Sequence, residues 1–327
     1  MLLEVKNLTT EFKLKRGIVK AVDDISFTID KGEILAIVGE SGSGKSVTSL
    51  SIMGLLQKPG KVTGGQIFYK SQDLSTLSKK ELQKLRGNQI SMIFQEPMTS
   101  LNPVWRIKDQ IMESIMLHMK LSKKDALART IEILETVGIP SAAQRANDYP
   151  HQMSGGMRQR VMTAMALACN PELLIADEPT TALDVTIQAQ ILELLYRMRE
   201  KFHMAVMLIT HDLGVVSEAA DRVIVMYCGK IMEEADVRTL FNNPMHPYTI
   251  GLLKSIPQID NDSDERLYMI KGMVPNPLNM PKGCPFSDRC EQSMERCTQE
   301  MPQLQDIDGH KVRCFLHDAK EGGSAKQ

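Results

Sequence analysis

The sequence carries almost no net charge, few aromatic residues and no long apolar run. Its 39 basic and 40 acidic residues nearly cancel, and Phe, Trp and Tyr together make up 5% of the 327 residues. Neither property favours a nucleic-acid partner, which usually needs a basic surface and aromatic stacking platforms. No apolar stretch reaches the roughly 20 residues that span a bilayer, and the charged start Met-Leu-Leu-Glu-Val-Lys is unlike a signal peptide. We therefore expect a soluble, cytosolic protein.

A glycine-rich loop lies between an apolar strand and a helix near the N-terminus. The pattern G-x-x-x-x-G-K-S occupies residues 39–46, after the β-branched run 34–38 and before the apolar segment 47–53. Such a loop points backbone N–H groups at a polyanion, and the helix N-terminus adds its positive dipole end. A tight glycine turn without a ligand is the alternative, which Lys45 and Ser46 disfavour. The pattern predicts a nucleoside triphosphate site with Mg²⁺, formed by Gly39, Ser41, Gly42, Ser43, Gly44, Lys45, Ser46 and Val47.

Strands and helices alternate along the first 240 residues. Alternating apolar positions predict a half-buried antiparallel strand at 25–29, and 223–232 has the pattern of a closing hairpin. Apolar residues three or four apart predict helices between 105 and 137, ended by Gly138. Another helix face is formed by Ile187, Ile191, Leu194, Leu195 and Met198. Short apolar runs predict further strands at 66–69, 90–94, 173–176 and 205–209. This alternation indicates an α/β fold with a largely parallel sheet covered on both faces.

Two carboxylates and a histidine follow neighbouring predicted strands. Asp177 and Glu178 end the apolar run 173–176, and His211 follows the run 205–209. Because parallel strands end at one edge of a sheet, these side chains should project toward the glycine-rich loop. We expect Asp177 to hold Mg²⁺ through water and Glu178 to polarise the attacking water. A solvated acidic loop and a structural histidine are the alternatives.

A second helix N-terminus carries glycines and a hydroxyl. Ser154, Gly155 and Gly156 precede a predicted helix, which makes a second anion site. The chain has one phosphate-binding loop, so this second site needs a phosphate from elsewhere. The pattern predicts a head-to-tail dimer in which each chain completes the ATP pocket of the other. A helix cap without a ligand is the alternative.

The composition changes beyond residue 241, where prolines multiply and periodicity fades. With 43% hydrophobic residues the chain can bury a large core and divide into a large and a small domain. We predict a domain at 1–240 that contains a helical subdomain of about 99–160, and a small domain at 241–319. The polar residues 320–327 predict a disordered tail.

Four cysteines lie within the small predicted domain. Cys284, Cys290, Cys297 and Cys314 are separated by five, six and sixteen residues, unlike the C-x-x-C pairs of common zinc sites. Longer loops suit a bulkier group, and four thiolates suit a [4Fe–4S] cluster. Zn²⁺ is an alternative because tetrahedral sulfur coordination fits both. A third interpretation is that the four thiols are buried and unrelated, which so short and proline-rich a segment disfavours.

Together these motifs resemble the nucleotide-binding subunits of ABC transporters over nearly the whole chain. Residues 39–46 match the Walker A motif, 173–178 the Walker B motif, Gln95 the Q-loop glutamine, 182–184 the D-loop and His211 the switch histidine. Residues 153–157, Met-Ser-Gly-Gly-Met, match the signature motif but have methionine at both ends of the usual L-S-G-G-Q.

This resemblance implies a P-loop NTPase with a RecA-like core, an antiparallel β subdomain and a helical signature subdomain. It implies that ATP and Mg²⁺ are bound, that Glu178, His211 and Lys45 act in hydrolysis, and that Gln95 senses the γ-phosphate. In this family an aromatic residue upstream of the phosphate loop stacks on adenine. Phe12 is the candidate here, and a core position is its alternative.

A subgroup is indicated by the motif His246-Pro247-Tyr248-Thr249 and by the cysteine-bearing tail. Both are similar to the C-terminal extension of dipeptide and oligopeptide importer ATPases, and 88–103 and 149–160 resemble their dipeptide-type D subunit. The resemblance implies an ATP hydrolase that energises peptide translocation, and a [4Fe–4S] cluster in the extension. It implies a peripheral protein at the cytoplasmic face of the plasma or inner membrane.

Several partners follow from the same resemblance. They are a second related ATPase in a heterodimer (a homodimer in isolation), two permease subunits and, indirectly, an extracytoplasmic binding protein. Importers of nickel–metallophore complexes or glutathione are alternatives for the cargo. A soluble ABC-type ATPase of DNA repair, chromosome structure or translation is a rival from another class, as is a regulatory iron–sulfur module with a degenerate ATPase. The intact Lys45, Asp177, Glu178 and His211 disfavour the last of these.

Overall fold

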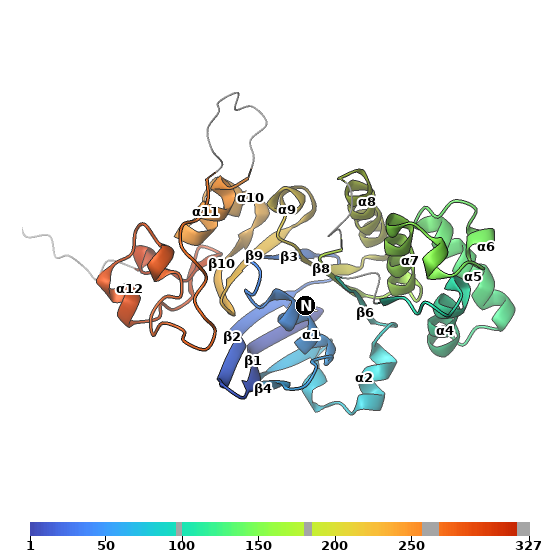
Figure 1. Cartoon of the computed structure of the whole chain (residues 1–327), viewed down its shortest axis with the longest axis horizontal. Coiled ribbons are helices and arrows are strands. Elements are labelled where there is room, and N and C mark those ends of the chain that lie inside the picture. Colours follow the sequence, from blue (N-terminus) through green and yellow to red (C-terminus); the bar gives the residue numbers. More distant parts are fainter. Residues whose placement is uncertain (96–99, 180–184, 257–267, 319–327) are drawn as a thin grey trace, which may run out of the picture.

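The computed structural model describes residues 1–95, 100–179, 185–256 and 268–318. Within these ranges the chain forms a central eight-stranded sheet and a four-stranded antiparallel sheet, with a helical region at one end and a loop-rich segment at the other (Figure 1). In the same ranges, none of the helices combines the length and apolar character needed to cross a bilayer. The predicted D-loop at 182–184 and the predicted tail at 320–327 lie outside the described residues.

Parallel strands form the greater part of the central sheet and extend to its β6 edge, as the sequence predicts. Their order is β9 (Arg222–Tyr227), β3 (Ile34–Val38), β8 (Ala205–Ile209), β7 (Leu173–Asp177) and β6 (Ile90–Ile93). Every residue of β3, β6, β7 and β8 is buried, as expected for strands covered on both faces. Side chains of β3 alternate between two cores. Leu35 and Ile37 enter one of them, and the other receives Ile34, Ala36 and Val38.

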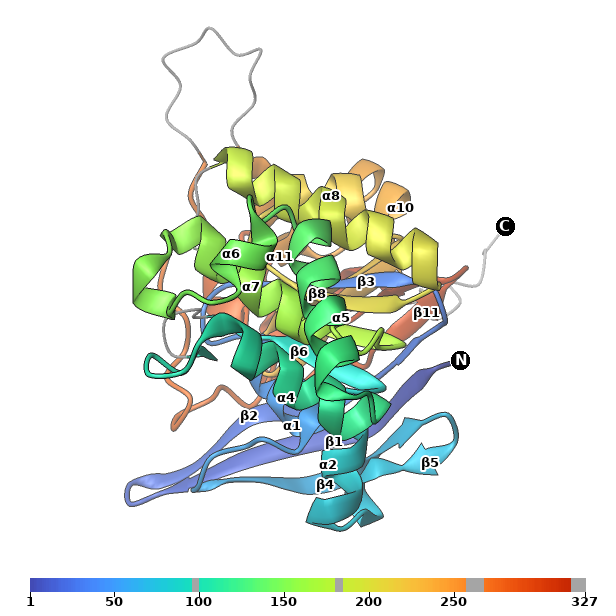
Figure 2. The same cartoon turned by 90° about the vertical axis from the view of Figure 1, so that its right-hand side faces the viewer.

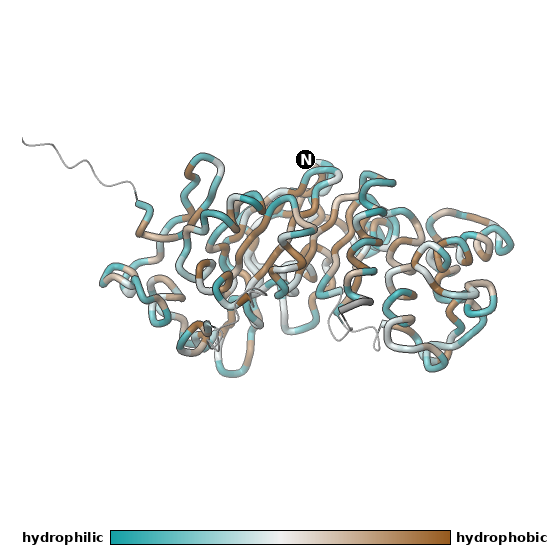
Figure 3. Tube along the Cα trace, turned by 90° about the horizontal axis from the view of Figure 1, so that it is seen from above, coloured by the Kyte–Doolittle hydropathy of each residue, from teal (hydrophilic) through white to brown (hydrophobic). Residues whose placement is uncertain are grey.

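Antiparallel strands continue the sheet beyond β9. The predicted hairpin is formed by β9 and β10 (Lys230–Asp236), and β12 (His310–Val312) and β11 (Gln305–Ile307) add two short strands from the end of the chain. The segment after residue 241 therefore shares the central sheet. Figure 3 shows that apolar residues follow the strands in the middle of the molecule, and that polar residues cover its periphery.

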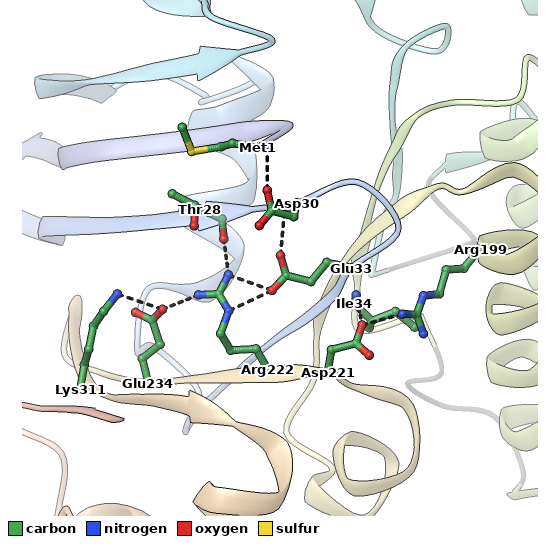
Figure 4. A network of polar contacts seen from close by, with 10 residues as sticks. All are labelled: Met1, Thr28, Asp30, Glu33, Ile34, Arg199, Asp221, Arg222, Glu234 and Lys311. Carbon is green, nitrogen blue, oxygen red and sulfur yellow. Dashed lines mark hydrogen bonds and ion pairs between the residues drawn. The ribbon is translucent and has the colours of Figure 1, made fainter. Parts of the chain in front are cut away.

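A charged network ties this edge of the sheet to the turn before β3 (Figure 4). The Arg222 guanidinium donates to Glu33 Oε1 at 2.9 Å and to Glu234 of β10, and Glu234 Oε1 also accepts from Lys311 Nζ of β12 at 3.2 Å. On the neighbouring turn, Asp221 accepts from Arg199. Because Glu234 is only 3% exposed, its two cationic partners offset the cost of burying its charge.

The antiparallel sheet lies below the central sheet in Figure 1, with α1 (Lys45–Met53) between the two. It contains β2 (Gly17–Ile29), β1 (Leu3–Leu14), β4 (Gly60–Tyr69) and β5 (Gln72–Asp73), in that order. In the predicted strand at 25–29, Ile25, Phe27 and Ile29 are buried and alternate with more exposed residues. The turn η1 (Leu74–Thr76) and α2 (Lys79–Leu85) follow the sheet, and a full capping box at Ser78 and Glu81 begins α2.

The helical region projects from the β6 end of the central sheet (Figures 1 and 2). Its elements are α4 (Ile107–Met119), α5 (Lys123–Thr136), α6 (Ala142–Arg145), η2 (Pro150–Gln152) and α7 (Gly155–Leu167). The predicted end of α5 is confirmed, since Val137 caps the helix and Gly138 follows with φ +77°, a backbone conformation that suits glycine.

The upper face of the central sheet is covered by further helices (Figure 1). They are α8 (Val185–Phe202), α9 (Leu213–Ala219), α10 (Val237–Asn242) and α11 (Pro247–Lys254). The predicted apolar face of α8 is buried at Ile191, Leu194, Leu195 and Met198. The loop-rich segment contains η3 (Ser287–Arg289), α12 (Glu295–Gln299) and η4 (Phe315–His317), at the opposite end from α4 to α7.

Candidate functional site: the phosphate loop and its surroundings

The phosphate loop, residues 39–46, connects β3 to α1 and depends on its glycines. Gly39, Gly42 and Gly44 have φ of +147°, +79° and +103°, which side-chain-bearing residues rarely adopt. A Cβ on Gly39 would lie 2.1 Å from the Met226 carbonyl oxygen, and one on Gly44 would lie 2.4 Å from the Ala21 carbonyl oxygen. The neighbouring backbones therefore leave no room for side chains here, and the loop stays open for a ligand on its other side.

Lys45 is the buried cation of this loop. Its Nζ donates to the carbonyl oxygens of Gly39, at 2.7 Å, and Glu40, at 3.0 Å. Burial lowers the pKa of Lys45, and the carboxylates of Glu178, Asp177 and Glu40 oppose that shift. The two carbonyls hold the ammonium group where its charge faces the open loop, and phosphate oxygens would be stronger acceptors.

Ser46 and Asp177 meet beside the loop. The Ser46 hydroxyl donates to Asp177 Oδ1 at 2.9 Å, and Asp177 is 4% exposed at the end of β7. Burial raises the pKa of Asp177, and the hydrogen bond from Ser46 opposes this. A buried carboxylate beside a hydroxyl is an oxygen donor set that fits Mg²⁺, whose charge would relieve the cost of burying Asp177.

Gln95 and His211 both contact Glu178. Gln95 Nε2 donates to Glu178 Oε2 at 2.8 Å, and His211 Nδ1 lies 3.5 Å from Glu178 Oε1. Glu178 has φ +46°, so the chain turns sharply after β7 and directs this carboxylate toward the loop. The predicted residues at the ends of β6, β7 and β8 thus come together at one edge of the sheet, and a water held by Glu178 could be deprotonated there.

Ser154, Gly155 and Gly156 begin α7. The Ser154 hydroxyl accepts from the Met157 N–H at 3.3 Å as an N-cap, and Ser154 and Gly155 are exposed. Among the described residues, no atom outside the neighbouring helix backbone lies within 4 Å of where a Gly155 Cβ would stand. This helix N-terminus is therefore open to an anion carried by another molecule.

Phe12 is half-buried on β1 and packs over Gly60 of β4. A Cβ on Gly60 would lie 2.7 Å from Phe12 Cε1. Thr10, two residues earlier on the same face, shares a 2.8 Å hydrogen bond with Ser51 of α1. Stacking of adenine on Phe12 stays a prediction.

The four predicted metal-ligating cysteines line one small cavity. Cys284, Cys297 and Cys314 are buried, Cys290 is partly buried, and all four thiols are free. Burial, with a smaller contribution from the three other thiols, raises the pKa of Cys284 to about 12, and a backbone hydrogen bond from Phe286 opposes this shift. The cavity has a volume of about 20 Å³. Within the described residues no three Cys, His, Asp or Glu side chains are arranged to hold a metal ion, so the predicted cluster is not supported here.

Two residues from the end of the chain reach the phosphate loop without having been predicted. The Tyr248 hydroxyl accepts from the Glu40 N–H at 2.9 Å, and Arg289 pairs with the Glu40 carboxylate at 2.6 Å. They lie 208 and 249 positions from Glu40. No local pattern connects residues that far apart, although the His-Pro-Tyr-Thr motif marks Tyr248.

Comparison with known proteins places this site in a family. The family described as "ABC transporter" matches residues 22–181, and "Oligopeptide/dipeptide transporter, C-terminal region" matches 232–297. The oligopeptide transport ATP-binding protein AppD of Bacillus subtilis is 57% identical over 97% of both chains. The dipeptide transport ATP-binding protein DppD of Haemophilus influenzae is 51% identical over 98% of this chain and 97% of its own.

Solved structures share the fold. A dimeric ATP-binding cassette in a post-hydrolysis state, bound to ADP and Pi, has a TM-score of 0.66 at 30% identity and covers 72% of this chain and 99% of its own. CbiO1 from Clostridium perfringens, part of the ABC transporter complex cbiONQ, has a TM-score of 0.62 at 27% identity over 74% of this chain and 91% of its own. The chain therefore belongs to the ATP-binding proteins of ABC transporters, in their oligopeptide/dipeptide group.

Proposed function

We propose that this chain hydrolyses ATP to drive an ABC importer for oligopeptides or dipeptides. The observation that carries the proposal is the convergence of Lys45, the Ser46–Asp177 pair and the Gln95–Glu178–His211 cluster at one edge of the sheet. The names of relatives at 50% identity and more support peptides as the cargo. Nickel–metallophore complexes and glutathione are the alternative cargoes, and a soluble non-transport ATPase is the remaining alternative.

In this proposal each side chain has one task at the γ-phosphate. Glu178 removes a proton from the attacking water, and Gln95 and His211 hold its two carboxylate oxygens. Lys45 stabilises the charge of the transferring phosphoryl group. Ser46 and Asp177 would hold Mg²⁺, which when bound neutralises charge on the phosphate oxygens. Phe12 stacks on adenine.

The proposed pocket is completed by a partner. Ser154 and Gly155 are exposed and Gly156 is partly exposed, and we assign the three to the γ-phosphate held by another ATPase subunit. That subunit is a related second ATPase, or another copy of this chain in isolation. The dimeric state of the cassette solved with ADP and Pi supports this arrangement.

Two permease subunits would bind beside Gln95, with an extracytoplasmic binding protein delivering the cargo. A cavity of about 590 Å³ opens between α1, β6, α4 and α7, lined by Phe94, Ser114, Met162 and Met165 among others. Its apolar and methionine-rich lining suits a helix from a membrane partner. The chain would then sit at the cytoplasmic face of the membrane as a peripheral subunit.

We also propose that the segment 241–319 forms an extension of the 1–240 domain and holds a metal through Cys284, Cys290, Cys297 and Cys314. The shared cavity of these thiols supports one ligand set, and when bound a [4Fe–4S] cluster or Zn²⁺ would cross-link the loop-rich segment. Anaerobic purification followed by iron and zinc analysis and a visible spectrum decides between the two.

Reconstitution tests the transport function. The chain, its partner ATPase and the permeases encoded beside it are placed in vesicles with the cognate binding protein, and uptake of a labelled tripeptide is compared with that of nickel–histidine and glutathione. Peptide uptake that requires ATP and stops in Glu178→Gln supports the proposal. Uptake of nickel–histidine or glutathione without peptide uptake would assign that cargo to the transporter in place of peptides. Failure to co-purify with any permease would refute the transport function.

A further inference from the structure

All three polar groups of Glu40, the second residue of the phosphate loop, are engaged. Its carbonyl oxygen accepts from Lys45 Nζ at 3.0 Å, its N–H donates to the Tyr248 hydroxyl at 2.9 Å, and its carboxylate pairs with Arg289. The first of these partners belongs to the loop itself. The other two come from α11 and η3, which lie beyond the ATPase core in the sequence.

The Arg289–Glu40 contact is a two-pronged ion pair. Arg289 Nη1 and Nη2 donate to the two carboxylate oxygens of Glu40 at 2.6 and 3.0 Å. Parallel N–H donors fix both the distance and the orientation of a carboxylate. The Arg289 side chain is 5% exposed, and that of Glu40 is 27% exposed, so water screens the pair only partly.

Arg289 is itself held in place from several sides. Its Nε donates to the Lys271 carbonyl at 3.1 Å, and Nη1 also donates to the Tyr227 hydroxyl at 3.1 Å. The guanidinium lies 5.8 Å from the ring centres of both Tyr227 and Phe286. Hydrogen bonding to Glu40 raises the pKa of Arg289, so the guanidinium stays charged at any physiological pH.

Tyr248 is equally immobile. It is fully buried, with its ring centre 4.6 Å from that of Tyr227 and 5.3 Å from that of Phe286. Aromatic packing leaves its hydroxyl in a single position, directed at the Glu40 N–H. Two side chains that are packed on several sides thus contact the same loop residue.

We propose that Arg289 and Tyr248 are positioning residues for ATP, which hold Glu40 and thereby the first turn of the phosphate loop in the conformation that receives the phosphates. Glu40 lies between glycine and serine, where the backbone has little intrinsic preference, so external contacts decide its conformation. Without them the loop would spend more time in conformations that do not bind ATP, and the apparent affinity would fall by the competent fraction. The inference rests on ATP binding at this loop.

The same contacts join the loop to the cysteine cavity. Arg289 directly precedes Cys290, and the N–H of Arg289 donates to the carbonyl of Phe286, a residue that lines the cavity. Arg289 therefore connects the phosphate loop to the cavity through one turn of 3₁₀ helix.

The test compares full-length Arg289→Gln, Glu40→Gln, their double variant and Arg289→Lys. Binding of the fluorescent analogue mant-ATP, and KM and kcat for ATP in the assembled transporter, are measured for each. We expect Arg289→Gln and Glu40→Gln each to raise KM and the mant-ATP Kd about 10- to 100-fold with a smaller change in kcat, because Glu178, Gln95 and His211 are untouched. The double variant should be no worse than either single one, since both remove the same contact. Arg289→Lys should recover part of the loss, because lysine keeps the charge without the two-pronged geometry.

Arg296→Gln is the matched control. Like Arg289 it directly precedes a cysteine of the cavity, but it pairs with Glu300 and Asp318 inside the loop-rich segment. It should leave KM and Kd within about twofold of the wild type. A purely structural role of Arg289 would lower the active fraction, and so kcat, at constant KM, which would overturn the inference.

Tyr248→Phe covers the case in which Arg289→Gln does not fold. It removes only the hydroxyl and should still raise the Kd severalfold. An unchanged Kd in Tyr248→Phe, or additive effects in the double variant, would refute the inference. Absence of mant-ATP binding by the wild type would refute ATP binding itself, which is a different outcome.

Discussion

At the scale of single residues, the site combines buried charges of both signs within a few ångströms. Lys45 and Asp177 are each about 95% buried, and burial alone moves their pKa values toward the neutral forms. The charge of each group offsets part of the cost of burying the other, and Ser46 adds a hydrogen bond to Asp177. A bound polyanion with its cation would complete this balance, which explains why the arrangement is stable and still open to a ligand.

Glu178→Gln tests the proposed general base. Glutamine keeps the shape and the contact to Gln95 but cannot take a proton, so ATP hydrolysis should fall at least about 100-fold while ATP binding is retained. Turnover by the assembled transporter and nucleotide retention on gel filtration measure the two effects, and the variant should accumulate as an ATP-bound dimer. Normal hydrolysis would show that another residue is the base.

Phe12→Ala tests the proposed adenine contact. Phe12→Ala removes the ring and should weaken ATP binding by about 1–3 kcal/mol. Phe12→Trp keeps an aromatic ring and should bind ATP about as well as the wild type. Phe68→Ala is the control, because Phe68 is a half-buried aromatic of the same sheet that packs under Lys6. Equal losses in the two alanine variants, measured by calorimetry with an ATP analogue, would mean that Phe12 serves only the sheet.

At the scale of elements, helix ends and strand ends place the chemistry. The ends of β3, β6, β7 and β8 carry Val38, Ile93, Asp177 and Ile209, and the functional side chains follow immediately. The Arg222 network of Figure 4 anchors the other end of this sheet, where Glu33 precedes β3. The phosphate loop is therefore attached to a strand whose start is fixed by charge and whose length is fully buried.

Asp236 at the start of α10 predicts a pH effect on this element. Its carboxylate accepts from the Thr239 N–H at 3.0 Å, and hydrogen bonds from Thr239 lower the pKa of Asp236. A carboxylate whose pKa is depressed on folding contributes stability above its unfolded-state pKa, and this contribution is lost as the pH falls through the lower, folded-state pKa. Asp236→Ala should cost about 1 kcal/mol of unfolding free energy at pH 7.

Asp236→Asn separates charge from capping. Asparagine still caps the helix, so this variant should lose only about 0.3–1 kcal/mol at pH 7, the value of a charge at a helix N-terminus. Its difference from the wild type should persist down to the ordinary aspartate pKa of 3.8 and shrink below it, because only the wild type titrates and its folded-state pKa is lowered. Urea unfolding at about pH 6 and about pH 3 measures this, and a difference that grows toward the lower pH would contradict the assignment.

At the scale of the whole molecule, the two anion sites lie in different parts of one chain. The phosphate loop, between β3 and α1, lies near the centre of the molecule. Helix α7, which begins with the second site, belongs to the helical region at one end (Figure 1). Ser154 and Gly155 are exposed in the single chain. In the proposed head-to-tail dimer both sites would share a ligand, and the groups needed for hydrolysis would be divided between two subunits.

Ser154→Ala tests that division. It should reduce hydrolysis at least about tenfold, with little effect on ATP binding by the isolated chain, because the hydroxyl serves the other subunit's nucleotide. The loss of a helix cap should also cost about 1 kcal/mol of stability. The rate per subunit of the isolated wild type should rise with protein concentration, and a rate independent of concentration and of Ser154 would exclude the shared pocket.

The sequence by itself determined the parts of the site whose determinants are local. An apolar strand is followed directly by a loop that contains three glycines, Lys45 and Ser46. Asp177 ends one buried strand, and His211 lies two residues after the next. Hydrophobic periodicity and the glycine and polar residues that end each run suffice to predict such features. The parallel sheet, the hairpin of β9 and β10 and the placement of Glu178 and His211 at one edge could therefore be predicted. Gln95 was identified through the family resemblance, and only the structure shows its hydrogen bond to Glu178.

Only the tertiary structure decided which distant segments meet. β11 and β12 have three residues each, too few for any periodicity, and they exist because β10 offers them an edge. Arg289 reaches Glu40 across 249 positions only because the loop-rich segment folds back against β9. Such contacts depend on the shape of the packed chain, since a charged or aromatic residue in an irregular segment carries no local sign of its partner.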